Sequence, residues 1–167
     1  AFEASNGFGN IHPGEDPDLS IRLWNLGFRT KLIKEAFVYH KRRISWEKFQ
    51  IQVNKFGKAR PILNSWYPEH TKITFWFPSL FLLGFVVSVL LTFVKFPYFL
   101  GVYVLYFGLL FGSSLLMNKS FKIAAYSVYA AIIQFYGYGK GFLLSFYKIF
   151  VLKLEPQKAF PELFFKK

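Results

Sequence analysis

The sequence predicts an α/β soluble segment followed by an α-helical transmembrane region. Three observations indicate this: mixed helix and strand patterns up to residue 72, two long uncharged runs, and an uneven distribution of charge. The 167-residue chain carries 21 Lys and Arg against nine acidic residues, yet no Asp or Arg follows residue 72. We therefore expect two domains, at residues 1–72 and 73–167.

The soluble segment is expected to begin with a loop and a short helix. Residues 1–15 are rich in Gly, Asn and Pro, as loops are. Asp16 followed by Pro17 is typical of a helix N-terminus, which predicts a helix over about 17–26 with Asp16 as its N-cap and Gly27 just past its end. Residues 28–33 and 36–40 then have the composition of two strands, separated by Lys34 and Glu35.

A second helix is expected over about 46–59, with Ser45 as its N-cap. Phe49, Val53 and Phe56 recur at helical spacing and form an apolar stripe. Lysines lie largely off that stripe. A basic amphipathic helix directly before an uncharged run is typical of a helix that lies in the membrane interface.

The uncharged runs predict a membrane domain. A helix of around 20 apolar residues crosses a bilayer, and the two runs give spans at about 75–94 and 97–117. A third span is expected at about 121–139, where Gln134 and three glycines weaken the signal, followed by an interfacial or re-entrant segment at 141–153. The basic soluble segment should stay cytoplasmic, as positive residues near spans do, which predicts a multi-pass protein of the inner cell membrane. Three spans would leave the C-terminal lysines outside and four would bring them inside, so both numbers stay open.

Nucleic acid is not an expected partner. The densest basic run is Lys41-Arg42-Arg43, which is short, and basic residues beside membrane spans are expected without any nucleic acid. The chain contains no cysteine, which excludes disulfides and thiolate metal sites.

The acidic residues Glu15, Asp16 and Asp18 lie close together in this basic chain. Neighbouring carboxylates repel one another unless a cation or a helix N-terminus compensates. A helix cap accounts for Asp16 and Asp18 but leaves Glu15 unexplained. A catalytic carboxylate pair is the alternative.

The order of motifs resembles the C-terminal half of a family 2 glycosyltransferase of the GT-A fold, over about residues 5–72. The matching residues are Gly14-Glu15-Asp16-Pro17-Asp18-Leu19-Ser20-Ile21-Arg22-Leu23, then Gly27, then Val38-Tyr39-His40. The resemblance implies that this segment is the C-terminal part of a Rossmann-like domain. The family's nucleotide-binding half and its Asp-x-Asp motif have no counterpart here, so the chain is expected to be an incomplete fragment that is inactive alone.

The resemblance also implies roles for individual residues. Asp16 would be the general base that deprotonates the acceptor hydroxyl, and Glu15 would orient the acceptor or tune Asp16. His40 would bind a divalent cation, Mg or Mn, or the diphosphate of the donor. Arg43 or its neighbour Arg42 would add positive charge there.

A further motif of the family, Gln-x-x-Arg-Trp, has a degenerate counterpart in Gln52, Lys55 and Phe56. Lysine keeps the charge of arginine without its bidentate fork, which argues against processive synthesis. The function implied is inverting transfer of a sugar from a nucleotide-sugar donor to a lipid-linked acceptor or a cell-envelope polysaccharide. The alternative is a non-enzymatic polytopic membrane protein, a transporter or assembly subunit, whose acidic cluster is only a helix cap.

Overall fold

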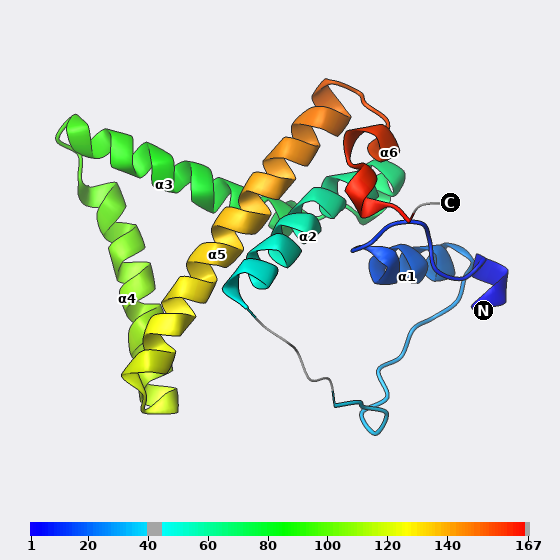
Figure 1. Cartoon of the computed structure of the whole chain (residues 1–167), viewed down its shortest axis with the longest axis horizontal. Coiled ribbons are helices and arrows are strands. Elements are labelled where there is room, and N and C mark those ends of the chain that lie inside the picture. Colours follow the sequence, from blue (N-terminus) through cyan, green and yellow to red (C-terminus); the bar gives the residue numbers. More distant parts are fainter. Residues whose placement is uncertain (40–44, 166–167) are drawn as a thin grey trace.

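The computed structural model describes residues 1–39 and 45–165, and every regular element within them is helical (Figure 1). The helices are α1 (Glu15–Asn25), α2 (Trp46–Trp66), α3 (Phe77–Phe93), α4 (Tyr98–Asn118), α5 (Phe121–Phe146) and α6 (Pro156–Ala159). Short 3-10 turns and one π-helical turn (Tyr147–Val151) connect or extend them. The predicted α/β class is therefore wrong. The implied GT-A fold is wrong with it, because the part of the chain that the structure describes contains no strand for a Rossmann-like sheet.

Within the described residues, the two predicted strands, 28–33 and 36–39, are irregular; residue 40, the end of the second predicted strand, lies outside the described residues. Residues 28–39 run away from the helices in Figure 1, with a turn at Lys34 and Glu35 where the break was expected. Their apolar side chains are exposed, Leu32 by 84% and Val38 by 89%. A strand pattern becomes a strand only when a neighbouring strand supplies hydrogen bonds and a packed face. No described segment offers either.

α1 forms where a helix was expected, but its N-terminus differs. The helix begins at Glu15, and its N-cap is Gly14 with a φ of 129°, a conformation that favours glycine. Asp16 as N-cap is therefore wrong. Pro17 lies in the first turn, where a helix does not use the missing N–H. Gly27, with a φ of 83°, follows the helix end as predicted.

α2 packs across α5 and forms the centre of the molecule (Figure 1). The Ser45 hydroxyl accepts a hydrogen bond from the Lys48 N–H at 3.2 Å, which confirms the predicted N-cap. The helix runs past the expected end to Trp66. Its buried side carries Val53, whereas Phe56 is 45% exposed, so the predicted apolar stripe is only partly correct.

The crossing of α2 and α5 depends on glycines at the contact. A methyl group on Gly57 would collide with the backbone carbonyl oxygen of Tyr138, and one on Gly141 with that of Asn54. The Asn54 side chain also donates a hydrogen bond to the Gly137 carbonyl at 3.0 Å. Close backbone approach through small residues is typical of helices that pack inside membranes.

α3 and α4 are long and apolar enough to cross a membrane, judged by length and composition. The qualifying segments are Ile73–Phe93 and Tyr98–Asn118, with mean hydropathies of 2.1 and 1.9. Only 11% and 6% of these windows are buried, whereas the core helix of a soluble domain is mostly buried. Membrane association is therefore supported. The expected third span, 121–139, lies within α5, and the segment 141–153 continues α5 into the π-helical turn.

A small core joins the start of the chain to its C-terminal segment. Ile11, Ile62 and Leu163 are fully buried together with Phe160. The His12 N–H donates to the Leu163 carbonyl at 2.7 Å. These contacts hold the loop before α1 against α2, and so fix the position of the acidic cluster.

Candidate functional site

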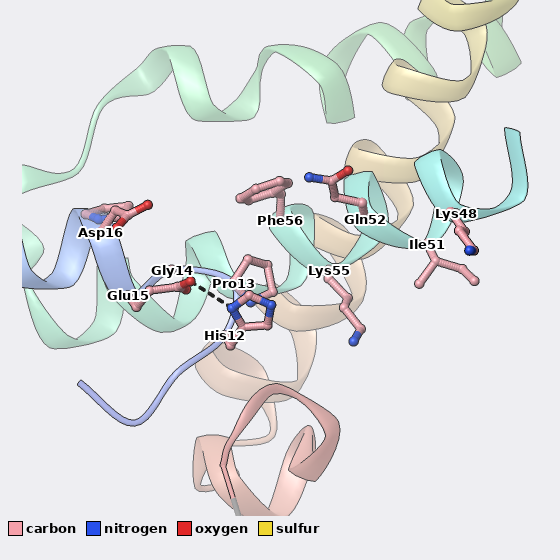
Figure 2. Close-up of a pocket in the computed structure, with 11 residues that line it drawn as sticks. His12, Pro13, Gly14, Glu15, Asp16, Lys48, Ile51, Gln52, Lys55 and Phe56 are labelled. Atoms are coloured by element: carbon pink, nitrogen blue, oxygen red, sulfur yellow. Dashed lines mark hydrogen bonds and ion pairs between the residues drawn. The ribbon is translucent and has the colours of Figure 1, made fainter. Parts of the chain in front are cut away.

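A cavity of about 340 Å³ opens between the start of α1 and the N-terminal half of α2 (Figure 2). The loop before α1 and the first turn of α1 form one wall, and successive turns of α2 form the other. The lining residues are His12, Pro13, Gly14, Glu15, Asp16, Pro17, Lys48, Ile51, Gln52, Lys55 and Phe56.

This cavity brings together most of the site residues expected from the sequence. Glu15 and Asp16 face it from α1, and Gln52, Lys55 and Phe56 line it from α2. The two groups are more than 30 positions apart in the sequence. The remaining expected site residues, His40 and Arg43, lie outside the described residues.

Glu15 is held in place by His12, a residue that sequence reasoning did not select. His12 Nδ1 and Glu15 Oε1 lie 2.8 Å apart, the interaction drawn in Figure 2. The only signal in the sequence is their three-residue spacing, which is too common to be informative. Glu15 Oε2 is buried and has no hydrogen-bond partner in the described part of the chain.

The pKa of the Glu15 carboxyl lies below its ordinary value. Burial acts to raise it, but backbone hydrogen bonds from Glu15 and Gly14 and the hydrogen bond and charge of His12 outweigh that effect. The backbone donors are available because Glu15 opens α1, where N–H groups have no helical partner. Glu15 is therefore an ionised anchor at neutral pH and not a proton donor.

Asp16 is exposed and lies across the cavity from Gln52 and Phe56 (Figure 2). No hydrogen bond or ion pair to another described side chain holds its carboxylate. An exposed carboxylate at the mouth of a cavity is free to accept a proton from a bound hydroxyl. Lys48 and Lys55 on the opposite wall offer ammonium groups to an anion.

Asp18 plays a different part from its acidic neighbours. It is only 4% exposed, pairs with Arg22 at 2.7 Å, and accepts a hydrogen bond from the Tyr67 hydroxyl at 2.6 Å. The pKa of Tyr67 is raised to about 12, mainly by burial and to a smaller extent by the adjacent Asp18 carboxylate. Arg22 also donates to the carbonyls of Ser5 and Gly7. This network fastens α1 to the end of α2. Asp18 lies in the first turn of α1, as expected, but its contacts with Arg22 and Tyr67 go beyond the helix cap predicted from the sequence.

A metal site is not formed by the side chains within residues 1–39 and 45–165, where no three His, Cys, Asp or Glu are grouped to hold an ion. His40, the residue expected to bind a divalent cation, is outside these ranges. The divalent cation therefore stays a prediction.

No family model, no curated protein and no solved structure matches the chain. No family match therefore supports the resemblance to family 2 glycosyltransferases. The helical fold contradicts the α/β architecture that this resemblance implied.

Proposed function

We propose that the cavity between α1 and α2 is the acceptor side of a membrane-bound site for sugar transfer. The donor would be a nucleotide sugar and the acceptor a lipid-linked sugar or a polysaccharide. One observation carries the proposal: the cavity joins the carboxylates of Glu15 and Asp16 to Gln52, Lys55 and Phe56 across a long stretch of sequence.

The chemistry proposed is a single displacement with inversion. Asp16 takes the proton from an acceptor hydroxyl while its oxygen bonds to the anomeric carbon and the bond to the nucleoside diphosphate breaks. The leaving diphosphate gains negative charge, which the ammonium groups of Lys48 and Lys55 would stabilise. Gln52 can hydrogen-bond a sugar hydroxyl, and the Phe56 ring offers an apolar face on which a sugar can stack.

On this proposal the protein is a multi-pass protein of the inner membrane, with the cavity on the cytoplasmic side. The support is the basic character of the segment before the two apolar helices, since positive residues next to spans are retained in the cytoplasm. Nucleotide sugars would reach the cavity from that side.

Replacing Asp16 with Asn tests the proposal. Asp16→Asn keeps the size of the side chain and removes its ability to take a proton. With the missing nucleotide-binding half supplied, membranes that contain the protein should lose sugar transfer from radiolabelled nucleotide sugar to lipid or polysaccharide by at least about a hundredfold, the usual contribution of a general base. The fold should be unaffected because Asp16 is exposed.

Glu47→Gln is the matched control. Glu47 is the second residue of α2 as Asp16 is of α1, and it is exposed and does not line the cavity. Its substitution should leave transfer within about twofold of the original rate. Equal activity of the Asp16→Asn protein would refute the base role of Asp16. Absence of transfer by the unsubstituted protein would favour the non-enzymatic alternative.

A further inference from the structure

A second cavity, of about 460 Å³, lies between α2 and α5. It shares Ile51 and Lys55 with the first cavity but opens along a different side of α2. Its lining is basic and amide-rich: Gln50, Ile51, Asn54, Lys55, Lys58, Tyr136, Gly137, Lys140, Leu144 and Glu162.

The charges in this cavity are not balanced. Lys58 Nζ pairs with Glu162 Oε1 at 2.9 Å, and Glu162 is the only acidic residue that lines the cavity. Lys55 and Lys140 form no ion pair with any side chain in the described ranges. Two lysines without counter-ions on one concave surface favour an anion, and phosphate oxygens suit ammonium donors.

An apolar cavity of about 220 Å³ adjoins the basic one. Its lining contains no charged residue and consists of Phe81, Leu82, Phe85, Phe107, Ile132, Phe135 and Tyr136. Tyr136 lines both cavities, and Lys140 Nζ lies 5.7 Å from its ring centroid. Because Ile132, Tyr136 and Lys140 are one helical turn apart on α5, the two cavities follow one another along that helix.

The positions of the two cavities along α3 also correspond to the headgroup and hydrocarbon layers of a bilayer. The Ser79 hydroxyl donates to the Gly139 carbonyl at 3.4 Å, so the start of α3 is level with Lys140. Phe81 stacks on Phe135 at 3.9 Å between centroids, further along α3. As α3 is a candidate span, its start lies at headgroup level and its later turns in the hydrocarbon.

We infer that the joined cavities bind one lipid with a phosphate-bearing, anionic headgroup. The headgroup phosphate lies among Lys55, Lys58 and Lys140, and an acyl or prenyl chain passes Tyr136 into the aromatic cavity. A free anion would leave the aromatic cavity unused, which favours a lipid over soluble phosphate. Lys55 lines both cavities, but the inference does not require sugar transfer, because Lys58 and Lys140 line only the second cavity.

The test uses the purified full chain in maltoside micelles, with dioleoyl phosphatidylglycerol binding measured by native mass spectrometry. Lys140→Gln should weaken binding about tenfold, as loss of one charged hydrogen bond does. Ile132→Trp, which fills the apolar cavity, should also weaken it. Both positions are exposed, so the fold should tolerate these changes.

Lys122→Gln is the matched control, because Lys122 also lies on α5 with its Nζ 5.7 Å from a tyrosine ring, that of Tyr126. It should change binding by less than about twofold. An equal loss in this variant would overturn the inference in favour of general attraction to anionic lipid. Unchanged binding to Ile132→Trp, or inorganic phosphate competing as well as the lipid, would overturn it in favour of an anion site without a chain.

Discussion

Asp18 shows how one buried carboxylate can organise a site without taking part in its chemistry. It accepts from Arg22 and Tyr67, and Arg22 in turn binds carbonyls of the N-terminal loop. The network joins three segments that are distant in the sequence. The orientation of α1, and with it the direction in which Glu15 and Asp16 point, follows from this network.

Asp18→Ala should therefore destabilise the protein by about 3 kcal/mol, since removing one partner of a buried pair leaves the other charge uncompensated. Thermal unfolding in detergent measures the effect, and hydrogen exchange should accelerate across α1. Glu35→Ala, at an exposed acidic residue of the irregular connection, should change neither. If Asp18→Ala left the melting temperature and the hydrogen exchange of α1 unaltered, the anchoring role of Asp18 would be contradicted.

The sequence could predict some of these residues and not others. The motif pattern linked Glu15 and Asp16 with Gln52 and Lys55, which line one cavity. His12 was missed because a histidine three residues before a glutamate has no distinctive meaning. Asp16 was wrongly expected as the cap, because Gly14 can adopt the positive φ at that position and the helix starts earlier.

At the level of elements, the glycines of α2 and α5 determine how closely the two helices approach. Gly57→Ala should lower stability by roughly 1–3 kcal/mol, the usual cost of overpacking, because the added methyl group meets the fixed backbone of Tyr138. A melting-temperature comparison in detergent measures the change.

Gly108→Ala is the control for that change. Gly108 lies inside α4, where an added Cβ meets nothing within 4 Å. Alanine should be neutral or slightly stabilising there, since it favours the helix. Equal destabilisation by both substitutions would mean that helix propensity, and not the crossing of α2 and α5, is responsible.

Helices were predictable here because their signals are local. The Ser45 cap and the uncharged runs depend on neighbouring residues, and α2, α3 and α4 formed where these signals lie. The strand pattern of residues 28–39 is also local, but a strand needs a partner elsewhere. The strand prediction for this segment was therefore wrong.

At the scale of the whole molecule, α3 and α4 leave most of their apolar surface uncovered. Because the chain contains no cysteine, single cysteines can test the orientation. Phe96→Cys, in the hairpin between α3 and α4, should react with a membrane-impermeant maleimide added to intact cells. Lys34→Cys, in the connection before α2, should react only after the cells are opened. The reverse pattern would contradict the cytoplasmic orientation.

The backbone hydrogen bond between the loop before α1 and the C-terminal segment determines the order in which parts of the fold can form. His12 and Leu163 are joined directly, yet α3, α4 and α5 lie between them in the chain. A growing polypeptide cannot close this contact until all three helices have been synthesised. One wall of the cavity thus becomes fixed only after Leu163 has been synthesised, and non-local contacts of this kind form slowly. Formation of the cavity is in this way coupled to the synthesis of α3, α4 and α5.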